Sequence, residues 1–396
     1  MTIDTRSGSA AVPRLVLILG VARSGTSLFT GILGRLGFHI PQPEVRADDT
    51  NPRGFGEPRW VVDFHSRFMR TRRVTVFDSR PAAWETMAEA AKDDAAFKDL
   101  RSWLSVQFVG TDNIIVKDPR TCWFLPLWLR CADDLGVEIS FATTLRHPPE
   151  VVSSARTWYG TWQSDPSRAA AWLNHTLQTE YATRGATRAF IRYEDLLDDW
   201  PREISRVAEL LGLHWLVGVD RSSHPDVDAL VDPSLRRSAV AWEETQVSPA
   251  LQSRVEDVWR TASGLADPDG DSAAARASLD VARGSYAQFY AEAEAIAQSS
   301  VTAVKPRRWE AGTLSAPPRR AGGGAHGEKL PLRMQIARRI PAPYQERVRL
   351  VARGVVLTRG LRLLLGMLLL IPPRYRERVP VPVVRAGFWI FRSLRR

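Results

Sequence analysis

The 396-residue sequence predicts an α/β fold, in which a parallel β-sheet is flanked by helices, followed by a basic amphipathic helical C-terminal tail. Residues 15–19 form a short apolar run typical of a buried parallel strand, and apolar residues then recur at helical spacing as far as Leu36. Two further strands are predicted at residues 113–116 and 138–145, and polar residues follow each of them directly. From residue 330 onward, apolar blocks alternate with arginines.

The segment that joins the first strand to the first helix predicts an anion-binding site. Residues 20–27 read Gly-Val-Ala-Arg-Ser-Gly-Thr-Ser. A glycine-bracketed turn before a helix directs backbone N–H groups and the positive end of the helix dipole at one point, which favours a phosphate or sulfate. The loop is P-loop-like in its glycine spacing, but Thr26 stands where an ATP- or GTP-binding loop has lysine. The cation is instead Arg23, whose guanidinium can bind one tetrahedral anion with two hydrogen bonds.

This loop resembles the 5′-phosphosulfate loop of sulfotransferases, which reads [KR]-S-G-T-[ST] and binds the donor 3′-phosphoadenosine 5′-phosphosulfate (PAPS). The resemblance implies that PAPS is the donor, that 3′-phosphoadenosine 5′-phosphate (PAP) is the product, and that no metal is needed. It also implies that the loop residues bind the 5′ end of the donor, namely Arg23, Ser24, Gly25, Thr26 and Ser27.

A long polar loop at residues 41–58 contains the sequence Asn-Pro-Arg-Gly-Phe-Gly-Glu, and its aromatic residue predicts that it is ordered. Loops of this length without secondary structure are usually functional or disordered. Bacterial carbohydrate-type sulfotransferases have a similar N-x-x-G-[YF]-x-E pattern, in which the glutamate is the general base. The resemblance implies that role for Glu57. The residue pattern alone leaves open a solvated or helix-capping carboxylate.

The second strand ends in Lys-Asp-Pro-Arg (residues 117–120), which places polar side chains at the carboxyl edge of the sheet, where ligands bind in open α/β folds. In sulfotransferases a lysine at a strand end stabilises the bridging oxygen of the leaving group, and the resemblance implies this role for Lys117. The small-molecule branch has a histidine base two positions later, whereas this chain has proline. Glu57 is therefore the first candidate for the base, and Asp118 and His147 are the alternatives.

The third strand leads into a second signature, R-x-P-x-x-x-x-x-S, formed by Arg146 and Ser154. In sulfotransferases these two residues bind the 3′-phosphate of the donor. A later Tyr-Glu-Asp-Leu segment is similar to one that places its tyrosine near the nucleotide, here Tyr193, although its acids could simply favour a helix N-terminus. Residues 232–237 resemble a basic segment that closes over the 3′-phosphate. Three aromatic residues after the second signature are expected in the core: Trp158, Tyr159 and Trp162.

The positive charge of the chain is concentrated at its end. The net charge is +10, but residues 331–396 hold 15 Lys and Arg against 2 Asp and Glu, so the remainder has a net charge of −3. The basic composition therefore does not indicate that the predicted catalytic part binds nucleic acid. The two cysteines, Cys122 and Cys131, have neither CxxC nor zinc-ligand spacing, which favours buried free thiols in a reducing cytoplasm.

The tail predicts attachment to a membrane surface. Its longest apolar run, residues 363–371, is far shorter than the roughly 20 residues that a spanning helix needs. Arginines combined with large aliphatic residues are typical of helices that lie in the interface of an anionic membrane. A protein partner and a nucleic acid are the alternatives, and the aliphatic content disfavours the nucleic acid. These features predict a cytoplasmic protein, peripheral on the inner face of the membrane.

The predicted organisation is a disordered leader (1–13), a sulfotransferase domain (14–300), a Pro/Gly/basic linker (301–329) and a basic amphipathic membrane-associating region (330–396). The predicted function is transfer of the sulfuryl group of PAPS to a hydroxyl of a glycan, glycolipid or other lipid-linked acceptor. Two alternatives belong to other classes. One is a P-loop kinase or NTPase, and the other is a non-catalytic membrane-bound nucleotide-binding scaffold.

Overall fold

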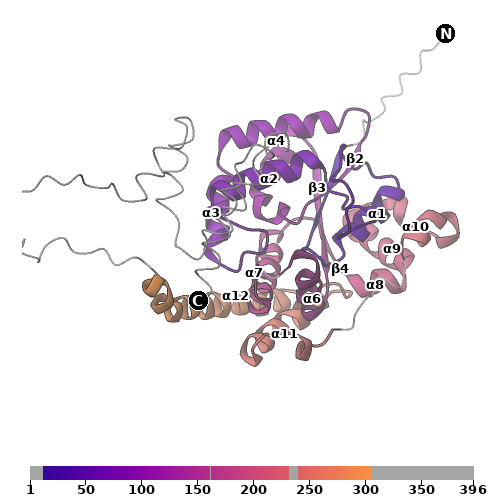
Figure 1. The fold of residues 1–396 in the computed structure, drawn as a ribbon. Helices are drawn as coiled ribbons and strands as arrows, with labels where there is room; N and C mark the ends of the chain where they lie inside the picture. The colour runs from indigo at the N-terminus through magenta and orange to yellow at the C-terminus, as the bar shows by residue number, and fades with distance from the viewer. Residues whose placement is uncertain (1–11, 161, 232–239, 305–396) are drawn as a thin grey trace, which may run out of the picture. The chain divides into compact units, whose positions relative to one another are not determined.

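The computed structural model describes residues 12–160, 162–231 and 240–304 (Figure 1). The predictions for residues 232–237 and for the tail therefore lie outside the described residues, as do those for most of the leader and of the linker. Within the described part of the chain, no helix is both long enough and apolar enough to cross a lipid bilayer.

Four parallel strands form one sheet in the order β2-β1-β3-β4, which confirms the predicted α/β fold. They are β1 (Arg14–Leu19), β2 (Asn113–Lys117), β3 (Glu138–Leu145) and β4 (Arg188–Arg192). Ile18 pairs with Lys117 and Leu19 with Thr143, so the first three strands end close to one another. This register gathers three strand-to-helix connections at one edge of the sheet.

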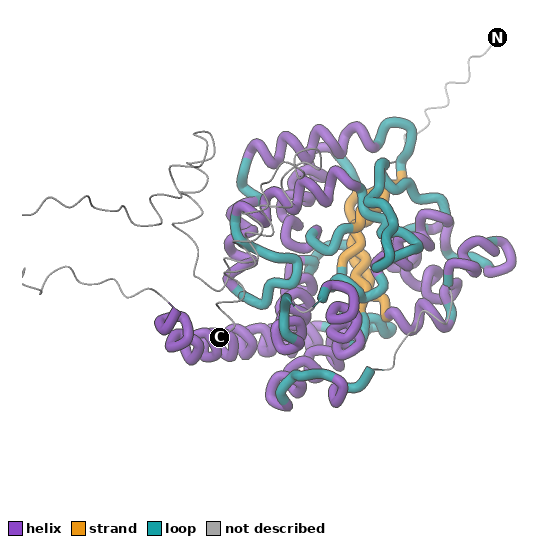
Figure 2. The backbone as a smooth tube through the Cα atoms, viewed as in Figure 1, coloured by secondary structure: helices purple, strands orange, loops and turns teal. Residues whose placement is uncertain are grey.

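Helices cover both faces of the sheet, and the strands form an inner layer between them (Figure 2). Successive side chains of β1 point to opposite faces, as the pleat requires. Val16 and Ile18 pack on one face against a cluster that includes Phe29 and Trp200. The helices of this face are α1 (Thr26–Arg35), α8 (Tyr193–Asp198), α9 (Trp200–Leu211) and α10 (Pro225–Leu230).

The opposite face of β1 presents Leu15, Leu17 and Leu19 to a second apolar cluster, which contains Trp128 and both cysteines. The helices of this cluster are α2 (Arg59–Thr71), α3 (Ala82–Ala90), α4 (Asp94–Gln107) and α5 (Leu125–Leu135). The prediction of buried free thiols is confirmed, because Cys122 and Cys131 are both buried and neither forms a disulfide. Short 3-10 turns lie at Thr121–Phe124, His214–Leu216, Arg221–Ser223 and Trp242–Glu244.

A third cluster packs α6 (Pro148–Tyr159) and α7 (Asp165–Ala182) against α11 (Pro249–Gly264) and α12 (Ala273–Val304). The pattern of residues 155–184 predicts one helix, but the structure divides this stretch into α6 and α7, and Gly160 after α6 has a φ of 73°. The pattern of residues 241–262 also predicts a helix, whereas α11 begins at Pro249, because proline suits the first helical turn. α12 continues beyond the boundary predicted at residue 300.

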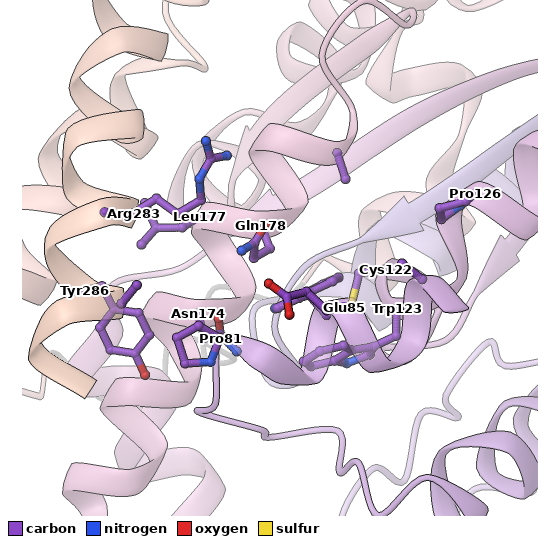
Figure 3. Close-up of a pocket in the computed structure, with 15 residues that line it drawn as sticks. Pro81, Glu85, Cys122, Trp123, Pro126, Asn174, Leu177, Gln178, Arg283 and Tyr286 are labelled. Carbon is purple, nitrogen blue, oxygen red and sulfur yellow. The ribbon is translucent and has the colours of Figure 1, made fainter. Parts of the chain in front are cut away.

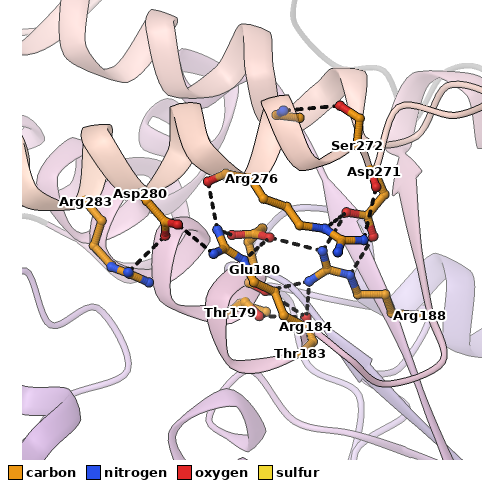
Figure 4. A network of polar contacts seen from close by, with 11 residues as sticks. Thr179, Glu180, Thr183, Arg184, Arg188, Asp271, Ser272, Arg276, Asp280 and Arg283 are labelled. Carbon is orange, nitrogen blue, oxygen red and sulfur yellow. Dashed lines mark hydrogen bonds and ion pairs between the residues drawn. The ribbon is translucent and has the colours of Figure 1, made fainter.

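A buried network of ion pairs joins the start of β4 to α7 and to the segment before α12 (Figure 4). The guanidinium of Arg188 contacts Glu180 Oε1 at 3.1 Å and both carboxylate oxygens of Asp271 at 2.7 and 2.8 Å. Arg184 contacts the other Glu180 oxygen at 2.7 Å. Because Glu180 is only 1% exposed, its charge depends on these two arginines.

Replacing Arg188 should therefore destabilise the folded protein. Arg188→Met leaves Glu180 with one partner and Asp271 without its bidentate contact, so we expect the free energy of unfolding to fall by about 3–5 kcal/mol in urea titrations followed by circular dichroism. The matched control is Arg260→Met, which breaks a solvent-exposed pair with Asp257 and should cost at most about 1 kcal/mol. Equal effects of the two substitutions would contradict the role assigned to the network.

Candidate functional site

A cavity of about 930 Å³ opens at the carboxyl edge of the sheet. It is bounded by the loop after β1, the loop at residues 41–58, the end of β2 and one side of α6. Nine of the ten residues predicted for the site line it: Arg23, Gly25, Thr26, Ser27, Glu57, Lys117, Arg146, Ser154 and Tyr193. The structure thus brings together residues that come from five separate parts of the sequence.

The loop after β1 has the geometry of an anion-binding turn. Gly25 is the N-cap of α1 and has a φ of 93°. The first N–H groups of α1 lack acceptors within the helix, so they are available to a ligand at this end. A side chain at Gly25 would collide with the ring of Tyr193, whose Cε2 lies 3.0 Å from the position of a Cβ atom. Glycine is therefore required here by both the backbone conformation and the neighbouring ring.

Ser24 is the predicted residue that the structure does not bring into the cavity. Its hydroxyl donates to the carbonyl of Val21 at 2.6 Å and contacts Thr144 Oγ1 at 3.0 Å. Its backbone N–H also donates to Val21, at 3.0 Å. Ser24 is 1% exposed and these contacts stabilise the turn itself, so its side chain lies outside the cavity lining, and its role in donor binding stays a prediction.

Arg23, Arg146 and Ser154 meet in one cluster, although Arg23 is far from the other two in the sequence. Arg23 Nε donates to Ser154 Oγ at 3.0 Å, and Arg146 Nη1 donates to the Arg23 carbonyl at 3.3 Å. The Arg146 guanidinium lies over the ring of Tyr193, 4.7 Å from its centroid, and pairs with Glu150 at 2.7 Å. Two arginines, a hydroxyl and an aromatic ring therefore face one part of the cavity.

Lys117 and Glu57 form a buried ion pair at the end of β2. Lys117 Nζ lies 2.5 Å from Glu57 Oε1 and 3.2 Å from both Ser27 Oγ and the carbonyl of Phe55. The side chains of Lys117 and Glu57 are only 3% and 10% exposed. Burial raises the pKa of Glu57, and this effect exceeds the opposing attraction of Lys117. The pair joins the first turn of α1 to the loop at residues 41–58.

The comparisons with known proteins agree with this geometry. A model described as "Sulfotransferase family" matches residues 13–216. The chain belongs to the sulfotransferase family. The solved structure of the sulfotransferase domain of the Synechococcus PCC 7002 olefin synthase is 20% identical, with 72% of this chain and 97% of that chain covered and a TM-score of 0.34. No match was found among proteins of curated function. The predicted family is confirmed, and the carbohydrate-type branch stays a prediction.

The two alternative bases of this sulfotransferase lie outside the cavity lining. Asp118 is fully buried, and its oxygens contact His65 Nδ1 at 2.8 Å and Arg120 Nη1 at 2.7 Å. Burial alone would raise the pKa of Asp118, but Arg120 and His65 hold it below the ordinary value. His147 contacts Glu256 at 3.0 Å, near the ring of Trp259. Of the three candidates, Glu57 is therefore the one that can meet a substrate in this cavity.

The cavity of the sulfotransferase is also lined by residues that the sequence did not predict for the site. Trp158, Tyr159 and Trp162 were expected in the core. All three border the cavity, Tyr159 also packs against the third apolar cluster, and Trp162 is 60% exposed. Arg120 lines the cavity as well. Its position directly after Lys-Asp-Pro, at a strand end, was a signal that could have identified it.

A second cavity, of about 450 Å³, lies between α3, α5, α7 and α12 (Figure 3). Its lining includes Pro81, Trp123, Leu177 and Tyr286, and none of the predicted site residues. Across residues 12–160, 162–231 and 240–304, no group of three or more His, Cys, Asp or Glu side chains is placed to hold a metal ion.

The collision at Gly25 gives a testable prediction for the sulfotransferase. Gly25→Ala should displace Tyr193 from the Arg146 guanidinium, so we expect the affinity for PAP to fall at least about tenfold in calorimetric titrations, together with a lower thermal midpoint.

Gly37→Ala is the matched control for Gly25→Ala. Gly37 has a similar φ of 100°, but an added Cβ would meet nothing within 4 Å. The control should therefore lower the thermal midpoint through backbone strain alone and leave PAP affinity unchanged. If both variants bound PAP like the wild type, the contact between Tyr193 and the loop would have no role in binding.

Proposed function

We propose that this sulfotransferase transfers the sulfuryl group of PAPS to a hydroxyl of a glycan, a glycolipid or another lipid-linked acceptor. One observation carries the proposal. The Arg23–Arg146–Ser154 cluster, the Glu57–Lys117 pair and the first residues of α1 line the same cavity. Sulfuryl transfer requires anion binding and a base within reach of one another, and this cavity supplies both.

The residues of the cavity fit an anionic donor. Three cationic side chains and the N-terminus of α1 face the same space, which is the donor set that phosphate and sulfate groups require. Arg146 and Ser154 would hold the 3′-phosphate, while Arg23, Ser27 and the N–H groups of Gly25 and Thr26 would hold the 5′ end. When bound, PAPS supplies the sulfuryl group. The chain supplies orientation through binding energy remote from the reacting atoms.

Glu57 would remove the proton from the acceptor hydroxyl. Lys117 contacts Oε1 of this carboxylate, so Oε2 is the oxygen that an acceptor can reach. Lys117 also lies within hydrogen-bond distance of Ser27 in the anion loop. It can therefore stabilise negative charge on the leaving phosphate while it keeps Glu57 oriented. The buried setting strengthens both interactions, because little solvent screens them.

The acceptor and the location of the enzyme are proposed from the composition of the tail. Residues 330–396 combine arginines with large aliphatic side chains, which favours the surface of an anionic membrane. A cytoplasmic enzyme held at that surface would meet lipid-linked or glycolipid hydroxyls. Binding of the purified protein to vesicles with and without phosphatidylglycerol tests this part of the proposal separately from catalysis.

Arg146→Ala tests the 3′-phosphate site. Because this contact is remote from the reacting atoms, its loss should raise the KM for PAPS by roughly tenfold or more while saturating donor restores most of the turnover. The measurement is initial rates of radiolabelled sulfate transfer onto a membrane extract, in the presence of EDTA. The control is Arg59→Ala, which removes an exposed arginine paired with Asp63 and should leave the KM unchanged. A kinase or NTPase would instead lose its activity in EDTA.

Glu57→Gln tests the base. We expect PAP binding to persist and turnover to fall on the order of 10²-fold or more. The wild-type rate should also decline as the pH falls through the pKa of Glu57, because a base acts only when deprotonated, and burial moves this decline above the ordinary range of glutamate. The variant should lack this decline.

Glu44→Gln is the control for Glu57→Gln, because Glu44 is a second carboxylate in the lining of the same cavity and contacts Gln42 at 2.7 Å. Its turnover and pH profile should match the wild type. An unchanged turnover in Glu57→Gln would exclude Glu57 as the base. A wild-type protein that shows no thermal stabilisation by PAP would instead favour the non-catalytic scaffold.

A further inference from the structure

We infer that Arg120 determines which acceptors this sulfotransferase takes, by binding an anionic group that lies beside the acceptor hydroxyl. The inference rests on the proposed function, because it assumes that the acceptor enters the cavity next to Glu57. The preferred acceptor is then a hydroxyl compound that carries a carboxylate or a phosphate near the hydroxyl that receives the sulfuryl group.

The buried carboxylate of Asp118 holds the guanidinium of Arg120 in place. Its Nη1 contacts Asp118 Oδ1 at 2.7 Å, and its backbone N–H donates to the same oxygen at 3.1 Å. The other Asp118 oxygen lies 2.8 Å from His65 Nδ1, and His65 Nε2 accepts from Trp128 Nε1 at 3.2 Å. Asp118 and His65 are both fully buried. This chain of contacts fixes the direction of the Arg120 side chain before any ligand binds.

Arg120 can be reached from the cavity. Its side chain is 25% exposed and belongs to the cavity lining. Among the residues that the structure describes, Asp118 is its one ion-pair partner, and the contact uses one of the three guanidinium nitrogens. A guanidinium with two further donor nitrogens can bind a carboxylate or a phosphate through a pair of hydrogen bonds.

The two clusters assigned to the donor do not include Arg120. Arg23 contacts Ser154 and its carbonyl accepts from Arg146, while Lys117 contacts Ser27 and Glu57. Arg120 lines the same cavity as Glu57 and follows Lys117, the contact partner of Glu57, by three residues. The attraction of this cation opposes the effect of burial on the pKa of Glu57. An acceptor whose hydroxyl meets Glu57 therefore presents its neighbouring substituents to Arg120.

The cavity also offers flat apolar surfaces. Trp158, Tyr159 and Trp162 line it, and the exposed ring of Trp162 can pack against the face of a sugar or another ring. A ring-bearing acceptor with an anionic substituent satisfies both the aromatic surface and the cation. Pyranosides that differ in one substituent are therefore suitable probes.

A purely structural role is the competing explanation, since a buried carboxylate such as Asp118 requires a cation. In a purely structural role, Arg120 would only neutralise Asp118 through their one side-chain contact. This role predicts that the protein does not distinguish anionic from neutral ligands. The two explanations differ in ligand discrimination, which can be measured independently of stability.

The test uses the full-length protein saturated with PAP, which keeps the two donor clusters occupied. Ligand-observed NMR titrations compare methyl β-D-glucuronide, methyl β-D-glucoside 6-phosphate and the neutral methyl β-D-glucoside. We expect at least one anionic probe to bind about tenfold or more tightly than the neutral one, with the preferred probe identifying carboxylate or phosphate. In Arg120→Gln this preference should disappear while the affinity for PAP is retained.

Two further variants separate recognition from folding. Arg120→Lys keeps a positive charge beside Asp118, so it should fold and retain a reduced preference even if Arg120→Gln does not fold. Arg35→Gln removes an arginine from the lining of the same cavity, where it pairs with Asp226 at 3.8 Å, and should leave the preference intact.

The inference is overturned if the wild type binds the three probes equally, if it binds neither anionic probe, or if the preference persists in every folded Arg120 variant. Failure of the wild type to bind PAP would instead refute the proposed function. The titration with PAP thus distinguishes the two failures.

Discussion

The parallel register of β1, β2 and β3 is the constraint on which the rest of the site depends. Because Ile18 pairs with Lys117 and Leu19 with Thr143, three strands deliver their following residues to one edge. The anion loop, the lysine of the buried ion pair and Arg146 all come directly after these strand ends. A slip of one residue in a strand would turn its side chains to the other face and separate these groups.

Close packing around Tyr193 then fixes the distance between the anion loop and the β3–α6 connection. The ring lies against Gly25 on one side and under the Arg146 guanidinium on another. Such a contact transmits a small displacement in either segment to the other, because a packed aromatic ring has little room to move. The Tyr193 ring therefore holds the loop after β1 and the β3–α6 connection in a fixed relative position.

The buried Glu57–Lys117 pair shows that this edge of the sheet is not optimised for stability alone. Removing two charges from water costs several kcal/mol per ion, and an apolar pair of similar volume is often as stable. The pair has additional contacts, to Ser27 and to the Phe55 carbonyl, that only polar groups could make. Buried charges that line a ligand cavity are typical of functional sites, where a protein keeps polar groups although apolar residues could be equally stable.

Most of the framework could be predicted from the sequence because it depends on local patterns. The β3 strand was predicted over residues 138–145, and these bounds agree with the structure. The anion loop follows from its glycines, since φ values such as 93° at Gly25 are accessible to few other residues. The family motifs then placed Glu57, Lys117 and Arg146 correctly in one cavity.

What the sequence could not provide is the direction of each side chain once the chain has folded. Ser24 shares its motif with four residues that line the cavity, yet its hydroxyl turns inward, where it donates to the Val21 carbonyl and lies 3.0 Å from Thr144 Oγ1. Thr144 comes from another strand, so no local pattern contains this contact. Trp162 is exposed for a different reason. It follows the break at Gly160, and a helical pattern does not continue across a break. In both cases the partner that decides the orientation is distant in sequence or depends on a backbone turn, and only the tertiary structure brings it into contact.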